Sequence, residues 1–238
     1  MKNNISKLIL NLLYPPRCIF CGKRLSPKTK LFVCSDCSNN LPYCKAYKRC
    51  KVCGNPIPEE YDICKKCYLT RPYITASTSA FVYADNVRSA IIAMKKPDNI
   101  GNARVFSFYI AGMVKGDFPQ VEFDAVVSVP QRKKLRKNKY DQAGALGKEV
   151  AKRLSLPYIT NVLCHTRQIE RQSSLPYESR LKNVKDAFKA NPDKIKGKTI
   201  LLIDDVRTTG STLNECGKAL KEAGAYRVYS GTAATTVI

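Results

Sequence analysis

Short apolar runs alternate with amphipathic segments along the chain from residue 76 to its end. Runs of strand length bounded by turn residues predict strands, and apolar positions three or four residues apart predict helices. In chain order, the predicted elements are strand 78–83, helices 87–95 and 103–113, strand 123–129, helix 141–154, strands 157–163 and 200–203, and helix 211–223. This alternation is typical of an α/β domain built on a parallel sheet.

The strand at 200–203 consists of four consecutive apolar residues between the turn sequences Lys-Gly-Lys and Thr-Thr-Gly. Such a run lacks the alternation of a half-exposed strand and favours a strand that is buried on both faces. Asp204 and Asp205 follow it directly, and a helix is predicted to begin at Ser211 and to end before Gly224. The sequence therefore places two carboxylates at the end of a buried strand.

The turn between this strand and the helix is rich in hydroxyl groups and is predicted to bind an anion. Unpaired backbone N–H groups and the positive end of the helix dipole converge at a helix N-terminus, where phosphate binds favourably. Carboxylates one turn earlier can accept hydrogen bonds from the cis hydroxyls of a ribose. The candidate ribose-phosphate residues are Asp204, Asp205, Thr208, Thr209, Gly210, Ser211 and Thr212. The alternative is that the two acids only form a solvated helix start.

The string LLIDDVRTTGST resembles the ribose-phosphate signature of type I phosphoribosyltransferases. The resemblance implies that Asp204 and Asp205 contact the ribose and that the turn 208–212 surrounds the 5-phosphate of phosphoribosyl pyrophosphate, which binds together with magnesium. In that fold the loop after the strand at 123–129 receives the pyrophosphate. The resemblance therefore assigns to this group Pro130, Gln131 and Arg132.

The same loop continues into a run of positive charge, with six lysines and arginines among the nine residues 131–139. Over the whole chain, 41 basic residues against 19 acidic residues give a formal net charge of +22. Such an excess favours a polyanionic partner such as nucleic acid or anionic lipid. The candidate nucleic-acid contacts are Lys133, Lys134, Arg136 and Lys137. The sequence leaves open whether this run serves a pyrophosphate, a nucleic acid or only solvation.

Nine of the eleven cysteines lie before residue 70, and eight of these nine form two matched sets of C-x-x-C pairs. Twelve residues separate the pairs of the first set, and ten separate those of the second. Four thiolates at this spacing suit tetrahedral zinc, so the sets predict two structural zinc sites. The candidate ligands are Cys18, Cys21, Cys34 and Cys37 in the first set and Cys50, Cys53, Cys64 and Cys67 in the second. Ligands shared between the sets, or a ligand role for Cys44, remain open.

The cysteine-rich segment is predicted to be a module of its own, 1–75, followed by the sheet domain, 76–238. The first 14 residues carry an apolar patch that is too short to span a bilayer, and no small-residue cleavage site follows it. We therefore expect a cytosolic protein with reduced thiols. Up to residue 70, seven aromatic residues are interleaved with lysines, which suits either base stacking or packing within the module.

The polar and basic segment 167–188 has little periodicity and is predicted to form a lid beside the phosphate site. His165, the only histidine of the chain, is assigned no role. Cys164 and Cys216 are expected to be small buried apolar residues.

Several motifs together resemble the ComF family of competence-associated proteins. They are Leu-Leu-Tyr-Pro-Pro-Arg-Cys-x-x-Cys at 12–21, the two cysteine sets, the polar segment at 172–188 and the DD-V-x-T-T-G motif. The resemblance implies a small double zinc ribbon joined to a type I phosphoribosyltransferase-like domain. It also implies a cytoplasmic location that includes the inner face of the membrane, and a part in handling single-stranded DNA with the DNA-uptake machinery.

One departure and one alternative accompany this resemblance. Where the family commonly has R-G-F-N-Q, this chain has Asn-Lys-Tyr-Asp-Gln at 138–142. The alternative function is an active phosphoribosyltransferase of nucleotide or base metabolism, whose acceptor the sequence does not identify.

We expect the purified protein to contain about two zinc ions per chain, each bound by four thiolates. Elemental analysis of the protein measures this ratio, and a folded protein that contains no metal would contradict both sites. Because the ligands come together only in the folded chain, removal of the metal by a chelator is expected to unfold the cysteine-rich segment.

Overall fold

The computed structural model of the chain describes residues 15–96, 100–131, 140–167 and 184–237. Three predicted features fall outside these ranges: the apolar N-terminal segment, most of the lid segment and the basic run after Gln131. The candidate residues outside the described ranges are Arg132, Lys133, Lys134, Arg136 and Lys137. In the described part of the chain, none of the helices has both the length and the apolar character needed to cross a membrane.

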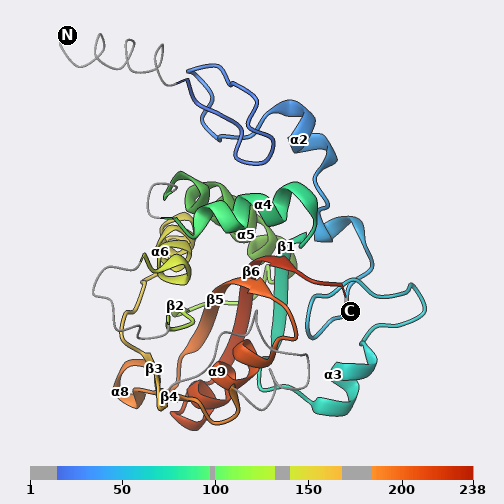
Figure 1. The fold of residues 1–238 in the computed structure, drawn as a ribbon. Coiled ribbons are helices and arrows are strands. Elements are labelled where there is room, and N and C mark those ends of the chain that lie inside the picture. Colours follow the sequence, from blue (N-terminus) through green and yellow to red (C-terminus); the bar gives the residue numbers. More distant parts are fainter. Residues whose placement is uncertain (1–14, 97–99, 132–139, 168–183, 238) are drawn as a thin grey trace, which may run out of the picture.

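Within the described ranges, a parallel sheet of four strands forms the centre of the molecule, in the order β1-β6-β5-β2 (Figure 1). The strands are β1 (Ala76–Val82), β2 (Ala125–Ser128), β5 (Thr199–Arg207) and β6 (Arg227–Thr235). Neighbouring strands run parallel throughout this sheet. The predicted α/β fold with a parallel sheet is therefore confirmed.

Helices cover both faces of the sheet, which explains the uninterrupted apolar run in β5. One face carries α4 (Asp85–Met94), α5 (Ile100–Asp117) and α6 (Gln142–Leu154). The other face carries α9 (Ser211–Glu222), the hairpin of β3 (Leu163–His165) and β4 (Phe188–Ala190), and the short helix α8 (Pro192–Ile195). Leu201 and Ile203 belong to the core on the first face, and Ile200 and Leu202 to the core on the second. Because successive side chains of a strand point to opposite faces, a strand covered on both sides is apolar throughout.

β5 extends beyond the predicted strand and includes both carboxylates of the motif. Its pairing with β6 continues as far as Arg207, whereas β2 ends at Ser128, opposite Ile203. From Asp204 onward, therefore, one edge of β5 has no strand beside it among the described residues. Asp204 and Asp205 lie at this open edge.

The segment 157–163 is not a strand of the main sheet, so this prediction is wrong. Tyr158 makes a single parallel bridge to Val126, and β3 pairs antiparallel with β4 in a separate small sheet. The physical reason is a turn inside the segment, where Asn161 has a φ of 54°. This left-handed conformation ends an extended strand.

Sequence patterning does not identify β6, the strand between β1 and β5, because its middle residues are small or hydroxylic instead of apolar. The hydroxyls of Ser230 and Thr232 form hydrogen bonds of 2.7 Å with the hydroxyls of Ser77 and Ser79 in β1. Small residues are required here, since a Cβ at Gly231 would lie only 3.1 Å from a side chain of α5. Paired hydroxyls thus satisfy the polar groups of a fully buried strand.

The cysteine-rich segment contacts the sheet beside both of its cysteine sets. It contains α2 (Ser35–Asn40), the 3-10 turn η1 (Cys44–Ala46) and α3 (Lys65–Thr70). Beside the first cysteine set, Phe20 packs edge-on against Phe81 of β1 and Phe106 of α5, with ring centroids 5.8 Å apart in both pairs. Beside the second set, the carbonyl of Val52 accepts a hydrogen bond of 2.8 Å from the backbone N–H of Ser77. Both cysteine sets are therefore anchored on β1.

Candidate functional site

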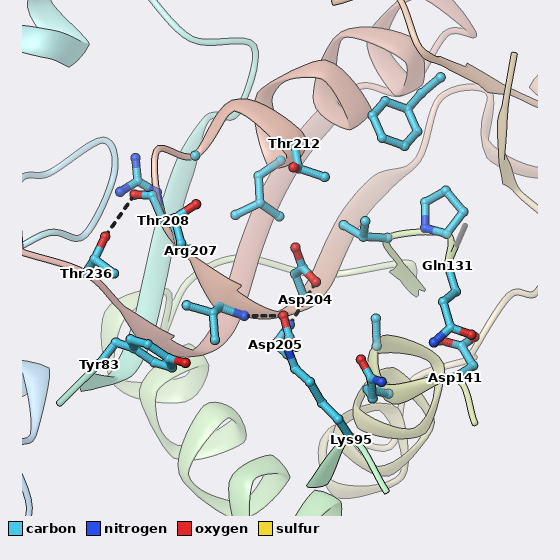
Figure 2. Close-up of a pocket in the computed structure, with 18 of the residues that line it drawn as sticks. Tyr83, Lys95, Gln131, Asp141, Asp204, Asp205, Arg207, Thr208, Thr212 and Thr236 are labelled. Atoms are coloured by element: carbon cyan, nitrogen blue, oxygen red, sulfur yellow. Dashed lines mark hydrogen bonds and ion pairs between the residues drawn. The ribbon is translucent and has the colours of Figure 1, made fainter. Parts of the chain in front are cut away.

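A cavity of about 660 Å³ opens at the carboxyl ends of β5 and β2, where the open edge of β5 begins. Its walls come from the end of β5, the turn before α9, residues 129–131 after β2, the start of α6 and the end of α4. Figure 2 shows Asp204 and Asp205 between Thr212 on one side and Lys95 on the other. Parallel α/β sheets bind ligands at this end of their strands, so the cavity is the candidate site.

The two carboxylates are adjacent in the chain but differ in environment. Burial and the charge of Asp205 together raise the pKa of Asp204 well above its usual range. Asp205 forms an ion pair of 3.1 Å with Lys95, the residue that caps the end of α4. Burial lowers the pKa of Lys95, but the charges of Asp205 and its neighbours outweigh this effect, and the net shift of the Lys95 pKa is upward.

Backbone amides fix the orientation of both carboxylates. The N–H of Asp205 donates to Oδ1 of Asp204 at 2.8 Å, and the N–H of Val206 donates to Oδ1 of Asp205 at 2.7 Å. One oxygen of each carboxylate therefore accepts a hydrogen bond from the backbone. Both Asp204 and Asp205 still line the cavity.

The turn before α9 has the geometry of an anion-binding helix start. Gly210 is the N-cap of α9 and has a φ of 75°, which favours glycine. Thr208, Gly210 and Thr212 line the cavity. Thr209 and Ser211 are buried instead, and their hydroxyls lie 2.5 Å apart. The candidate residues of this turn thus divide into three that face the cavity and two whose side chains hold the turn in shape.

Residues after β2 form the opposite wall. Pro130 and Gln131 line the cavity, and Nε2 of Gln131 donates to the carbonyl of Tyr140 at 2.8 Å. His165 also lines the cavity, although sequence analysis assigns it no role. Its Nε2 lies 3.0 Å from the carbonyl oxygen of Pro130, and its ring lies 4.8 Å from that of Phe188.

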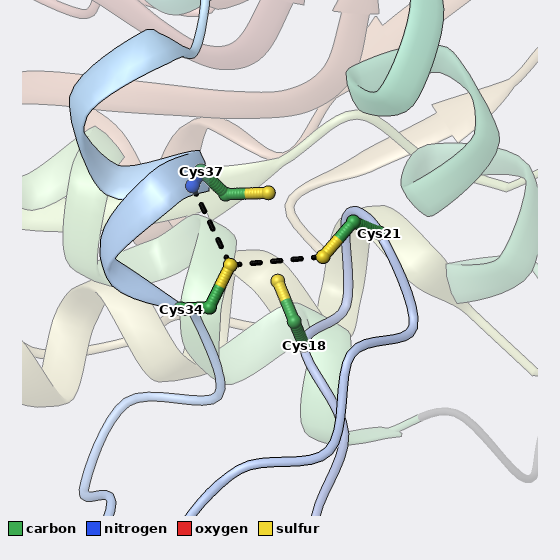
Figure 3. A group of neighbouring side chains, drawn as sticks. All are labelled: Cys18, Cys21, Cys34 and Cys37. Carbon is green, nitrogen blue, oxygen red and sulfur yellow. Dashed lines mark hydrogen bonds between the residues drawn. The ribbon is translucent and has the colours of Figure 1, made fainter.

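The cysteines form two separate clusters, each made of one predicted set. In each cluster the four sulfur atoms lie within 4.8 Å of one another. Figure 3 shows the side chains of the first cluster pointing toward one another. Ligands are therefore not shared between the sets. Backbone N–H groups donate to the sulfurs of Cys34, Cys50 and Cys64 at 3.3 to 3.5 Å, and such contacts stabilise thiolates. Four clustered thiols with these donors fit a structural zinc ion.

The remaining cysteines differ from expectation in one case. Cys44 belongs to neither cluster, and burial raises the pKa of its thiol to about 12. Cys216 is fully buried, as expected. Cys164 is exposed, which corrects the prediction, because it lies on the outward face of the edge hairpin while its neighbour Leu163 points inward.

Comparison with known proteins agrees with this architecture. Residues 9–68 match the family described as a double zinc ribbon domain, and residues 142–236 match the phosphoribosyl transferase domain. Competence protein F of Haemophilus influenzae is 26% identical over 215 residues, which are 87% of this chain and 92% of that protein. DNA utilization protein YhgH of Escherichia coli is 27% identical over 202 residues, 82% of this chain and 87% of that protein. The chain thus has a double zinc ribbon before a phosphoribosyl transferase-like domain, and it is similar to these two proteins over most of its length.

The chain also resembles part of a larger enzyme. Amidophosphoribosyltransferase of Rattus norvegicus is 36% identical over 110 residues, which are 46% of this chain and 19% of that protein. The resemblance and the domain match together support a phosphoribosyltransferase-like domain in this chain.

Three cationic residues of the cavity are not identified by sequence reasoning. Arg88, Lys95 and Arg207 all line the cavity. In the sequence, Lys95 looks like an ordinary basic helix end, and Arg207 occupies a variable position of the motif. Only the folding of α4 against the end of β5 brings Lys95 to Asp205, so no local signal could have found this pair.

We expect Asp204→Asn to raise the unfolding temperature of the protein at pH 8. Because the pKa of Asp204 is raised in the folded state, the stability falls as the pH rises from the ordinary aspartate pKa to the raised one, and this loss disappears as the pH returns to the ordinary value. The unfolding temperature should rise by about 2–4 °C for each kcal/mol of stabilisation in a chain of this size. The rise should be smaller at pH 5.

Thermal unfolding of wild type and variant at both pH values measures this difference. Asp193→Asn, which removes an exposed carboxylate of α8, is the matched control and should not show the gain. An Asp204→Asn protein that is no more stable than wild type at pH 8 would contradict the buried charge.

Proposed function

We propose that this ComF-like protein binds phosphoribosyl pyrophosphate, with magnesium, in the cavity at the end of β5, and acts in the handling of single-stranded DNA during natural transformation. The observation that carries the proposal is the placement of two backbone-oriented carboxylates opposite a glycine-capped helix start across one cavity. This pairing suits a ligand that has hydroxyl groups at one end and a phosphate at the other.

In this proposal Asp204 and Asp205 accept hydrogen bonds from the ribose hydroxyls. The 5-phosphate lies in the turn 208–212, where backbone N–H groups and the dipole of α9 favour an anion. Lys95 offsets the charge of Asp205. The hydroxyl donors of the ribose and the magnesium ion would offset the rest of the acidic pair.

The pyrophosphate lies against the opposite wall, where Pro130 and Gln131 line the cavity and Arg132 follows in the chain. Magnesium, when bound with the ligand, neutralises phosphate oxygens. The carboxylates of the cavity fit this ion, because magnesium takes few protein ligands and prefers oxygen. Arg88 and Lys95 give the cavity further positive charge for a ligand that carries several negative charges.

Charge and aromatic exposure support the nucleic-acid part of the proposal. The net charge of +22 favours a polyanion, and Lys133, Lys134, Arg136 and Lys137 form the densest basic run. Tyr47, Tyr61 and Tyr68 of the cysteine-rich segment are 50%, 60% and 74% exposed, so these three rings are available for stacking on bases. The names of the two relatives, a competence protein and a DNA utilization protein, agree with a part in DNA handling. In this proposal the protein works in the cytoplasm or at the inner face of the membrane, beside DNA-uptake proteins.

An active phosphoribosyltransferase is the second candidate, and the similarity to amidophosphoribosyltransferase favours it. In that reaction a nitrogen nucleophile forms a bond to the anomeric carbon as the bond to pyrophosphate breaks. The site would act through positioning of the ligand and electrostatic support of the leaving group. Release of pyrophosphate on addition of candidate bases distinguishes an enzyme from a protein that only binds the ligand.

Replacement of both carboxylates, Asp204→Asn with Asp205→Asn, is expected to abolish binding of phosphoribosyl pyrophosphate. The amides keep the shape of the side chains, but they accept hydrogen bonds from the ribose more weakly than carboxylates do. Isothermal titration calorimetry in the presence of magnesium measures the affinity, with Asp193→Asn as the control that should bind as wild type does. An unchanged affinity of the double variant would reject the site.

Binding of single-stranded DNA is expected to weaken steeply with salt. Replacement of Lys133, Lys134 and Arg136 by alanine should reduce the slope of log affinity against log salt by about two. The reason is that each phosphate contact contributes about 0.7 to this slope for single strands. Fluorescence anisotropy with a labelled oligonucleotide over a salt series measures the slope. Alanine at the exposed lysines Lys28, Lys115 and Lys148 removes the same charge elsewhere, and an equal loss in this control would argue against a specific role for the basic run.

A further inference from the structure

The second cysteine cluster lies directly beside the turn that precedes α9. Asn55 follows Cys53 and Gly54 in the tight turn of this cluster and is only 5% exposed. Gly54 has a φ of 70°, and a Cβ at this position would overlap the carbonyl oxygen of Ser77 in β1. The turn that holds Cys53 is therefore pressed against the sheet, which brings Asn55 to the end of β5.

Asn55 accepts a hydrogen bond from Arg207, the last residue of β5. The distance from Nη1 of Arg207 to Oδ1 of Asn55 is 2.5 Å. The guanidinium also packs against the turn, because a Cβ at Gly210 would lie only 2.7 Å from Nη2 of Arg207. In Figure 2, Arg207 and Thr208 lie beside Thr236, on the opposite side of the cavity from Gln131 and Asp141. Arg207 thus connects Asn55 to the glycine that caps α9.

The same asparagine is tied to the end of β6. Its Oδ1 accepts from the hydroxyl of Thr235 at 2.6 Å, and its Nδ2 donates to the carbonyl of Thr236 at 3.2 Å. The hydroxyl of Thr236 in turn donates to the carbonyl of Thr208 at 3.3 Å. The buried side chain of Asn55 therefore contacts the ends of β5 and β6, and Thr236 links it to the turn 208–212.

Two further contacts join the cysteine-rich segment to this turn and to α9. Nζ of Lys66, which precedes Cys67 in α3, donates to the carbonyl of Thr209 at 2.5 Å. The backbone N–H of Tyr73 donates to Oδ1 of Asn214 in the first turn of α9 at 2.8 Å. Asn55, Lys66 and Tyr73 of the cysteine-rich segment together hold the turn and the start of α9.

The charge of Arg207 needs compensation, because the residue is only 7% exposed. Among the described residues Arg207 forms no ion pair with a carboxylate. Four thiolates around one zinc ion carry a net negative charge. Arg207 lies beside this cluster, because its hydrogen-bond partner Asn55 is two residues from Cys53. The metal cluster is a suitable counter-charge for Arg207.

We propose that Asn55 and Arg207 are positioning residues through which the second zinc site holds the turn 208–212 in its anion-binding form. Metal binding at Cys50, Cys53, Cys64 and Cys67 and ligand binding in the cavity are then coupled. This inference rests on the proposed function, in which the turn receives the 5-phosphate. Coupling between two sites is reciprocal, so the ligand must stabilise the zinc by the same factor as the zinc strengthens the ligand.

Calorimetry with phosphoribosyl pyrophosphate and magnesium on the zinc-loaded protein tests the first half of the coupling. Asn55→Ala is expected to weaken binding at least about fivefold, the lower end of typical coupling between sites. Asn55→Asp keeps the acceptor oxygen for Arg207 and should bind within about twofold of wild type. Lys23→Ala alters the equivalent position after Cys21 and Gly22 in the first cluster and is the matched control, also expected to bind as wild type.

Competition with a chromogenic zinc chelator tests the reciprocal half, and it does not depend on activity. In the wild type, saturating phosphoribosyl pyrophosphate should slow the loss of one of the two zinc ions. The ligand should leave the other ion unaffected. In Asn55→Ala the ligand should no longer protect either ion. Zinc content and unfolding temperature show whether each variant is folded. If Asn55→Ala does not retain its zinc, Arg207→Lys replaces it. The same weaker ligand binding and the same loss of zinc protection are expected for Arg207→Lys.

The outcomes separate this inference from the function on which it rests. If the wild type binds the ligand and Asn55→Ala binds it equally well with the same zinc protection, the coupling is overturned and the proposed function stands. If the wild type shows no binding, both are overturned. Weaker binding by Asn55→Ala that Asn55→Asp restores, together with lost protection of one zinc ion, supports the coupling.

Discussion

The unequal pairing of β5 is the constraint on which the rest of the structure depends. β6 pairs with β5 along its whole length, whereas β2 stops opposite Ile203. The paired part is buried on both faces and is held by apolar packing, while no described strand lies along one edge of the part beyond Ile203. A cavity results at the point where the strand changes from apolar to acidic residues. The position of the site thus follows from where one neighbouring strand ends.

The cavity collects charges that are costly to bury. Asp204 and Asp205 lie side by side, and the raised pKa of Asp204 records the cost of their proximity and burial. Lys95 offsets part of it through its ion pair with Asp205. Sites that bind charged ligands commonly lower the stability of the fold in this way. The apolar core around the site provides the stability that the site lacks. A ligand with hydroxyl donors and phosphate oxygens fits both the acidic edge and the helix start.

The cysteine-rich segment is joined to the sheet by two different kinds of contact. Near the first cluster the contact is apolar, with Phe20 between Phe81 and Phe106. Near the second cluster it is polar and buried, with Asn55 and Arg207 at its centre. Apolar packing tolerates small shifts, whereas a buried charge with few partners does not. For this reason metal binding at the second cluster, and not at the first, affects the conformation of the turn before α9.

Local features of this protein can be predicted from its amino-acid sequence. The four-residue apolar run predicts a strand buried on both faces, the glycine and hydroxyls after it predict a helix start, and the C-x-x-C spacing predicts two four-sulfur sites. Each of these signals is short-range, and the structure contains all three. The match of a motif to its surrounding elements was sufficient to predict the fold class and the two types of domain.

How these parts meet depends on contacts between segments that are far apart in the chain. β6 lacks an apolar pattern because its buried hydroxyls pair with those of β1, and a pairing across more than half of the chain leaves no local signal. The segment 157–163 has strand-like composition, yet the turn at Asn161 keeps it out of the sheet. Lys95, Asn55 and Arg207 look ordinary in the sequence. They gain their roles because folding brings a helix end, a cysteine turn and a strand end to one place, and their contacts depend on distances in space that spacing along the chain does not encode.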